Sequence, residues 1–423
     1  MGLTMTEKIL KRTSGQDAIK PGDIVTCKVD FLLVGEAFGR AEKILKEAGV
    51  NKVWDPSKIV VLADHSVPPP AIINAQNSKD HREAVKEFGI IHDYKDRAGI
   101  CHQVLMEKGH VKPGMLLLGT DSHSTTSGAV GAAGCGFGTT EIAYMLKTGS
   151  IWLRVPSTIR INLNGSFGKG VMSKDIILYI AATYGADFAQ YKAIEYNGPM
   201  AHAMSVASRM TISNMGVDLG AKFVQFEADE VTYNYLKDRV DPNDEFKLVE
   251  SFKADPDAVY ERIIDIDVSA LEPYVACPHT LENSKPISQV KDVKIDQAFL
   301  GSCTNARLED LEIAVKILKG KKVHPDVRMV ILPASTEIFV EAMHRGYVDT
   351  FIEAGALMGT PGCGPCCGTH LGILAAGETC IGSHNRNSRG RMGHQDSFVY
   401  LSSPATVAAS AIEGRVADPR NYL

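Results

Sequence analysis

The sequence has no apolar segment that approaches the roughly 20 residues needed to cross a bilayer. Residues 1–11 are mixed polar and lack the apolar run of a secretory signal. Positive charge is not in excess either, because 45 Lys and Arg stand against 50 Asp and Glu, so charge gives no reason to expect nucleic acid as a partner. The nine cysteines are an odd number without regular spacing, which argues against a secreted disulfide framework. We therefore expect a cytoplasmic protein with reduced thiols that binds neither nucleic acid nor membrane.

The sequence does contain short apolar runs that alternate with helical stretches over most of its 423 residues. This alternation favours a parallel α/β architecture. The chain is too long for one ordinary core, and the charge-rich, irregular stretch 241–286 suggests a boundary. We expect α/β domains at 1–154, 155–285 and 286–423. Predicted strands are 58–63, 90–91, 115–119, 155–164, 295–300 and 327–332, and predicted helices include 141–146, 308–319 and 400–413.

Three cysteines carry the most specific chemistry. Cys363 and Cys366 lie in one Gly- and Pro-containing loop, and Cys303 follows a distant predicted strand. Three such thiolates can hold three corners of an iron–sulfur cube and leave one iron open to substrate. The Cys-Gly-Pro-Cys segment also suits a thioredoxin-like dithiol, or a zinc site with His370 as a further ligand. The motif alone leaves cluster, dithiol and zinc open, and it assigns no role to Cys367.

Polar loops follow or join several of the apolar runs. An Asp beside a His fixes the imidazole and raises its basicity, and Arg side chains form forked hydrogen bonds to carboxylates. Because sites in open α/β sheets lie at the carboxyl ends of strands, these loops predict one polar pocket. A structural role is the alternative for any single histidine, and a solvated basic loop is the alternative for 385–391. The loops are Asp64-His65, Cys101-His102-Gln103, Asp121-Ser122-His123 and residues 385–391.

Together these segments resemble the aconitase superfamily, and within it the large subunits of two-subunit enzymes of the isopropylmalate dehydratase type. The resemblance extends over nearly the whole chain, and so many motifs in one order make chance negligible. The matching motifs are Asp64-His65, Ile100-Cys101-His102-Gln103, Gly119-Thr120-Asp121-Ser122-His123, Ser213-Asn214-Met215-Gly216, Gly301-Ser302-Cys303-Thr304-Asn305, Thr360-Pro361-Gly362-Cys363-Gly364-Pro365-Cys366, Asn385-Arg386-Asn387 and Tyr400-Leu401-Ser402-Ser403-Pro404-Ala405.

The resemblance implies three α/β domains around a cleft that contains one 4Fe–4S cluster. Its open iron would bind and polarise a substrate hydroxyl, which the Asp64–His65 pair would protonate. The implied metal ligands are Cys303, Cys363 and Cys366. The implied catalytic residues are Asp64, His65, His102, Asp121, His123 and Asp218, and the implied substrate-binding residues are Ser122, Asn214, Asn385, Arg386 and Arg391.

The implied reaction removes water from a small 2-hydroxy diacid and adds it back at the neighbouring carbon. Isopropylmalate is the first expectation, with homoaconitate and 2,3-dimethylmalate or methylmalate-type diacids as alternatives. These alternatives stay open because Asp218 stands where Glu is usual, and Ala306 where Gly is common. Residues 124–126 also differ from the stretch that is usual in isopropylmalate enzymes.

The base that would remove the substrate proton is missing from these motifs. Single-chain relatives carry it on a fourth, swivelling domain, whereas this sequence stops soon after the third. We therefore expect a separate small swivel-domain subunit to supply the base and much of the specificity. Two hypotheses from other functional classes remain. The chain could be a thiol–disulfide redox protein using Cys363 and Cys366, or a cluster-bearing binding protein without catalysis. The second is disfavoured because cluster binding alone does not need Asp64-His65 or the arginines.

Overall fold

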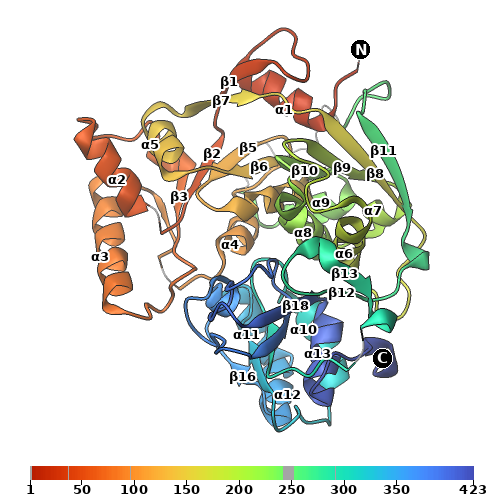
Figure 1. Cartoon of the computed structure of the whole chain (residues 1–423). Helices are drawn as coiled ribbons and strands as arrows, with labels where there is room; N and C mark the ends of the chain where they lie inside the picture. Colours follow the sequence, from red (N-terminus) through yellow and green to blue (C-terminus); the bar gives the residue numbers. More distant parts are fainter. Residues whose placement is uncertain (1, 37, 96, 242–251, 291) are drawn as a thin grey trace.

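The computed structural model describes residues 2–36, 38–95, 97–241, 252–290 and 292–423. Within these residues the strands form sheets of five, four and seven strands and a two-stranded ribbon. The seven-stranded sheet and its helices lie at the bottom of Figure 1, below the parts of the chain built on the other two sheets. The described part of the chain contains no helix with the length and apolar character required to cross a membrane.

The five-stranded sheet is wholly parallel, in the order β4-β3-β2-β5-β6. All residues of the central strands β2 and β5 are buried, as expected of a parallel sheet covered on both faces. Its strands are β2 (Phe31–Val34), β3 (Ile59–Val61), β4 (His92–Asp93), β5 (Leu116–Gly119) and β6 (Ala133–Gly136). Its helices are α2 (Phe38–Glu47), α3 (Ile72–Glu87), α4 (Cys101–Glu107), the 3-10 segment η2 (Ser122–Val130) and α5 (Thr139–Thr148). Before and after it lie α1 (Met5–Ser14) and the ribbon of β1 (Ile24–Lys28) and β7 (Ser150–Arg154).

The four-stranded sheet is also parallel, in the order β10-β9-β8-β11. In β8 the side chains of Ile159, Ile161 and Leu163 are buried on one face, as the alternating sequence predicts. The strands are β8 (Thr158–Asn164), β9 (Ala193–Asn197), β10 (Phe223–Phe226) and β11 (Arg262–Asp267). The helices are α6 (Ser173–Tyr184), α7 (Pro199–Ala203), α8 (Val206–Met215) and α9 (Glu230–Leu236).

The seven-stranded sheet runs in the order β13-β12-β18-β17-β14-β15-β16. The strands from β18 to β16 are parallel, and β12 pairs antiparallel with both β13 and β18. The strands are β12 (Tyr274–Ala276), β13 (Ser284–Pro286), β14 (Gln297–Leu300), β15 (Arg328–Ile331), β16 (Leu357–Met358), β17 (Thr379–Gly382) and β18 (Phe398–Ser402). The helices are α10 (Leu308–Leu318), α11 (Thr336–His344), α12 (Tyr347–Ala354) and α13 (Pro404–Glu413).

Three local predictions were wrong. Residues 90–91 precede a strand instead of forming one, since the pairing to β3 is made by 92–93. Residues 400–402 end β18, and the helix predicted over 400–413 begins only at Pro404, a residue suited to a first helical position. The stretch predicted as irregular holds β11, β12 and β13, while its residues 242–251 lie outside the described part. The division into three domains stays a prediction. The strand β12, which precedes the expected boundary at 285, pairs within the seven-stranded sheet.

Candidate active site

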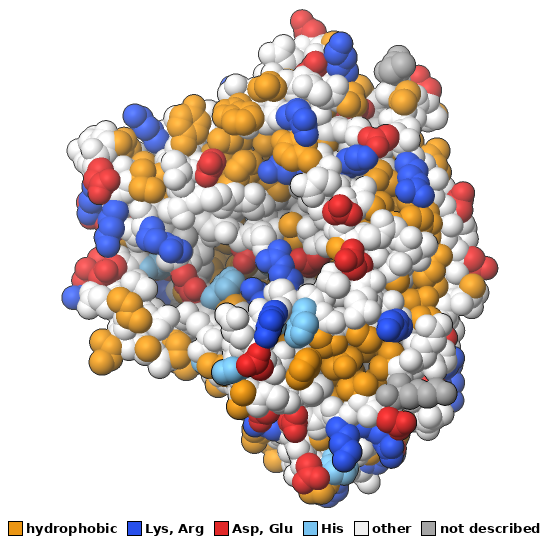
Figure 2. All heavy atoms as spheres, in the orientation of Figure 1, with side chains coloured by type: hydrophobic (Ala, Val, Ile, Leu, Met, Phe, Trp, Pro, Cys, Tyr) orange, Lys and Arg blue, Asp and Glu red, His pale blue; other side chains and the backbone are white. Residues whose placement is uncertain are grey.

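Loops from the five-stranded and seven-stranded sheets meet around one cavity. The loops follow β3, β5, β14 and β17 at their carboxyl ends, the position expected for a site in open α/β sheets. Figure 2 shows His, Asp or Glu, and Lys or Arg side chains gathered in a hollow on this face. The cavity is lined by Asp64, His65, Ile100, His102, Asp121, His123, Cys303, Cys363, Cys366, Cys367, Asn385 and Arg391.

The three predicted cysteine ligands are all buried at this cavity. Cys363 and Cys366 lie on one 3-10 turn, where the Cys366 N–H donates to the Cys363 carbonyl at 3.2 Å. The Cys363 N–H donates to the Asp64 carbonyl at 2.9 Å, which ties this turn to the Asp-His loop. Cys303 lies on the turn after β14, which ends at Ala306 with a φ of 71°. That left-handed backbone explains why glycine is common at this position.

The cysteine geometry separates the three chemistries that the motif left open. Among the described residues, the ligand atoms of Asp64, His65 and Cys363 all lie within 4.8 Å of one another, whereas the sulfurs of the three cysteines do not form such a group. At least one pair of these sulfurs is therefore more than 4.8 Å apart. A zinc ion bound to sulfur at about 2.3 Å needs sulfurs about 3.8 Å apart. His370, the suggested zinc ligand, instead places Nε2 3.2 Å from the His65 carbonyl oxygen. The three cysteines are therefore too widely spaced to bind one zinc ion together, whereas Asp64, His65 and Cys363 lie close enough to share a metal ion.

The thiol environment also differs from that of a reactive dithiol. Burial raises the pKa of Cys363 and of Cys366, whereas a thioredoxin-like motif needs a lowered one. Donors point at the sulfurs: Asn385 Nδ2 lies 3.2 Å from Cys303 Sγ, and Arg391 Nη2 lies 3.8 Å from Cys366 Sγ. Such donors stabilise thiolates that ligate a metal centre. Three buried thiols with hydrogen-bond donors directed at them are a donor set that fits an iron–sulfur cluster.

Two Asp–His pairs adjoin the cysteines. Asp64 Oδ1 lies 2.6 Å from His65 Nδ1, and Asp64 Oδ2 accepts the Cys101 N–H at 2.8 Å. Asp121 Oδ1 lies 2.8 Å from His102 Nε2, and Asp121 Oδ2 lies 3.4 Å from His65 Nε2. Burial alone would lower the pKa of His65, but Asp64, with Asp121 and Glu36, holds that pKa well above the ordinary value. Burial would raise the pKa of Asp121, but His102, with His123 and His65, holds that pKa well below the ordinary value. The Asp64 carboxylate thus favours the charged form of the His65 imidazole.

Asp218 and Ser122 do not line the cavity but contact His123, which does, and Arg386 is bound to both of them. Asp218 Oδ2 lies 3.2 Å from His123 Nε2, so the shorter carboxylate still reaches the imidazole. Arg386 donates from Nε to Asp218 at 2.7 Å and from Nη2 to the Ser122 hydroxyl at 3.2 Å. Burial would lower the pKa of His123, but Asp218 and Asp121 together oppose this effect and the net pKa is raised. These contacts fix the orientation of Arg386 beside the site.

Asn214 supports the cysteine loop from helix α8. Its Oδ1 accepts the Thr304 hydroxyl at 2.9 Å, and Asn385 Nδ2 lies 3.4 Å from the same oxygen. Two buried polar atoms near the cavity have no hydrogen-bond partner among the described residues: His102 Nδ1 and Arg391 Nε. Buried polar groups are normally paired, so these two atoms have hydrogen-bonding capacity that the described residues leave unused.

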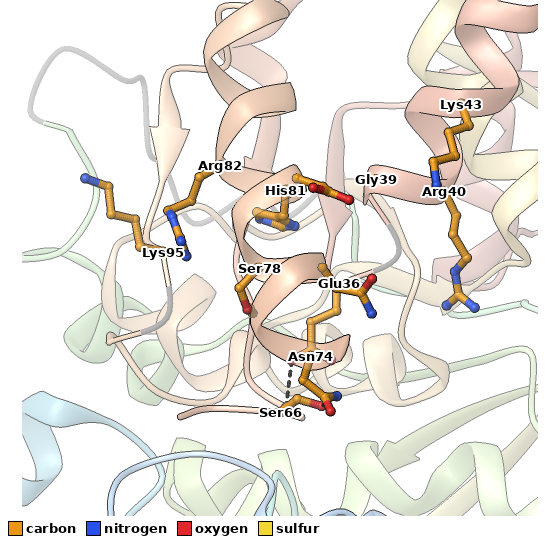
Figure 3. A pocket seen from close by; sticks show the side chains of 13 residues that line it. Glu36, Gly39, Arg40, Lys43, Ser66, Asn74, Ser78, His81, Arg82 and Lys95 are labelled. Atoms are coloured by element: carbon orange, nitrogen blue, oxygen red, sulfur yellow. Dashed lines mark hydrogen bonds between the residues drawn. The ribbon is translucent and has the colours of Figure 1, made fainter. Parts of the chain in front are cut away.

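Ile100 and Cys367 also line the cavity, and Glu36 lies behind it, although the sequence predicted none of these three as site residues. The Glu36 carboxylate accepts the N–H groups of His65 at 2.9 Å and Ser66 at 2.7 Å. Asn74 Nδ2 donates to the Ser66 hydroxyl at 3.1 Å and holds the same loop from α3, and both residues line a neighbouring cavity (Figure 3). The available signal was the position of Glu36 just after the short strand β2.

A model of the aconitase family (aconitate hydratase) matches residues 40–292 and 279–414. The chain belongs to the aconitase family. It is 49% identical over 424 residues to "3-isopropylmalate dehydratase large subunit 1" of Methanopyrus kandleri, covering 100% of both chains. It is 46% identical over 420 residues to "Probable 3-isopropylmalate dehydratase large subunit" of Methanothermobacter thermautotrophicus, covering 99% of both. Aconitase X of Thermococcus kodakaraensis shares the fold, with a TM-score of 0.51 at 12% identity, over 91% of this chain and 93% of that one.

Membership in the aconitase family confirms the resemblance and the α/β fold that the motifs predicted. The family implies an iron–sulfur cluster, in agreement with the cysteine geometry of the cavity. The roles of the individual site residues stay predictions.

Proposed function

We propose that the chain is the large subunit of a 3-isopropylmalate dehydratase, a hydro-lyase of the aconitase family. One observation carries the proposal: relatives with that name are 43–49% identical to this chain over nearly the full length of both. The geometry of the cavity, with three cysteines beside two Asp–His pairs, supports the same chemistry. The alternative diacids, homoaconitate and dimethylmalate or methylmalate types, lack comparable support.

The cofactor in this proposal is one 4Fe–4S cluster held by Cys303, Cys363 and Cys366. When bound, the cluster supplies a Lewis-acidic iron that polarises the substrate hydroxyl as a leaving group. Asn385 and Arg391 donate toward Cys303 and Cys366, and these hydrogen bonds would stabilise the sulfurs as thiolates once they ligate the cluster.

His65 is the proposed acid for the departing hydroxyl. With Nδ1–H donated to Asp64, the transferable proton of the imidazolium is on Nε2. Asp64 fixes this ring orientation because its second oxygen is held by the Cys101 N–H. Dehydration then requires loss of a proton from the carbon next to a substrate carboxylate, and return of water to the neighbouring carbon completes the isomerisation.

Arginines are the proposed contacts for the substrate carboxylates. Arg391 lines the cavity, and Arg386 is oriented by Asp218 and Ser122. A guanidinium held in this way binds a carboxylate without reorganising, and it stabilises the charge that grows there as the adjacent proton is removed.

The proton-abstracting base is proposed to come from a small swivel-type subunit. The names of the relatives describe them as large subunits, which supports a smaller partner. This chain alone would then hold a cluster but turn over little.

The proposal is tested with the chain loaded anaerobically with iron and sulfide and combined with a small subunit of the same enzyme type. We expect dehydration of 3-isopropylmalate with a higher kcat/KM than for homocitrate or 2,3-dimethylmalate. Cys303→Ser in the same complex should abolish the reaction. Preference for another diacid would replace the substrate, and a cluster-loaded complex inactive on all three would contradict the proposal.

A further inference from the structure

Lys174 is a completely buried cation in the first turn of α6, a helix that supplies no residue to the cavity. Its Nζ donates to the carbonyl oxygens of Ser383 and His384, the latter at 2.5 Å. In Figure 1, α6 lies at the border between the green part of the chain and the blue part below it. Lys174 therefore reaches from the part of the chain built on the four-stranded sheet into the one that carries the cysteines.

The two acceptor carbonyls belong to the loop that presents Asn385 to the site. Ser383 also joins this loop to the Cys303 turn, because its hydroxyl accepts the Gly301 N–H at 3.0 Å and lies 3.2 Å from the Gly301 carbonyl oxygen. Asn385 in turn lies against Cys303 Sγ. The ammonium of Lys174 thus fixes, from behind, the two loops that shape one side of the cysteine site.

The charge of Lys174 has no ion-pair partner among the described residues, because its hydrogen bonds are to carbonyl groups alone. A buried charge without a counter-ion is costly. Burial lowers the pKa of Lys174 to about 7, while Asp310 and then Cys366 oppose that shift from a distance. His384 does not compensate, since burial and the nearby Lys174 and Arg391 cations hold its pKa well below the ordinary value.

We propose that Lys174 is a positioning residue and the buried counter-charge of the anionic centre formed when the three cysteines ligate an iron–sulfur cluster. The charge of three thiolates outweighs that of the cluster core, so the loaded site is negative, and a dicarboxylate substrate makes it more so. Arg391 approaches the sulfurs from the cavity side, whereas Lys174 acts from behind the Ser383–Asn385 loop. Since Lys174 does not line the cavity, it acts through this loop and through its field. The inference rests on the proposed function.

The test compares two variants that separate the charge from the hydrogen bonds. Lys174→Met keeps the length of the side chain but removes both the charge and the donor. Lys174→Gln removes the charge and keeps N–H donors for the carbonyls. Lys169→Met is the matched control, because Lys169 is exposed on the loop before α6. In anaerobically loaded protein, we would measure iron and sulfide per chain, the rate of iron loss to a chelator, and the cluster reduction potential.

We expect Lys169→Met to behave as wild type. Both Lys174 variants should have a more negative cluster reduction potential, because a nearby positive charge favours the reduced, more anionic cluster. Iron loss should be about tenfold faster in Lys174→Met, as expected for losing a charged buried donor. Lys174→Gln should lose iron more slowly than Lys174→Met.

Several results would overturn this role. One is a cluster reduction potential equal to that of wild type in both Lys174 variants. Another is a lower thermal midpoint of the apoprotein with an unchanged potential, because this combination indicates a purely structural role. If Lys174→Met fails to fold, Lys174→Gln decides the question by its potential. Wild-type protein that takes up no iron would overturn the proposed function itself, which distinguishes the two failures.

Discussion

Replacing Asp64 by asparagine removes the buried carboxylate that holds His65 protonated. Asp64 Oδ1 lies 2.6 Å from His65 Nδ1, and only 3% of the Asp64 side chain is exposed. The carboxylate is the largest influence that raises the pKa of His65 against the effect of burial. In Asp64→Asn the shape is kept but the charge is lost, so the pKa of His65 should fall.

The size of the effect follows from the strength of the pair. A hydrogen bond to a charged group contributes about 1.5–3 kcal/mol, and one pKa unit corresponds to about 1.4 kcal/mol. Because 37% of the His65 side chain is exposed, solvent screens the pair and the lower end applies. We expect the pKa of His65 to fall by about one unit.

The assay is the pH dependence of kcat/KM for dehydration by the cluster-loaded two-subunit complex. A raised pKa keeps the acid protonated at neutral pH, and activity is lost as pH rises through that pKa. The alkaline limb of the profile should therefore move to lower pH in Asp64→Asn. Asp17→Asn, a substitution of an exposed carboxylate, should leave it in place. An unchanged alkaline limb in Asp64→Asn, with iron content equal to wild type, would refute His65 as the acid.

Three further variants test other parts of the site and the fold. His65→Ala should retain wild-type iron content and lose about 10²–10⁴ in kcat, and near-normal turnover would show the acid assignment to be wrong. Cys366→Ser should lose iron and activity together on anaerobic loading, and full iron retention would remove Cys366 from the ligand set. Asp229→Ala should lower the free energy of unfolding, measured with urea, by about 3 kcal/mol. The buried guanidinium of Arg209 is paired with Asp229 at 2.6 Å, and the substitution leaves it without a carboxylate. An unchanged urea midpoint would contradict that last expectation.

The sequence predicted those parts of the site in which the chemically important residues are close together along the chain. Asp64 and His65 are neighbours in the chain, and Cys363 and Cys366 share one turn, so each pair is visible before folding. The convergence of loops from the same sheet also followed from topology, because the carboxyl ends of parallel strands lie at one edge of a sheet. The meeting of loops from the five-stranded and seven-stranded sheets does not follow from that rule. The alternation of apolar runs was enough to predict the α/β class.

The missed residues act through partners that sequence does not display. Lys174 binds backbone carbonyls some two hundred positions away, and a lysine in the first turn of a helix ordinarily lies exposed. Glu36 binds the amide groups of His65 and Ser66 in the same way. The strand β11 was missed because its charged residues face solvent at the edge of the four-stranded sheet, which hides the apolar alternation of Ile264 and Ile266.

The proposed function depends on an iron–sulfur cluster held by three cysteines of this chain. Its most direct test is anaerobic loading of wild type and Cys303→Ser with iron and sulfide, followed by counting both elements per chain. We predict about four irons in wild type and their loss in Cys303→Ser. A wild-type chain without iron that instead forms a reducible Cys363–Cys366 disulfide would contradict the account.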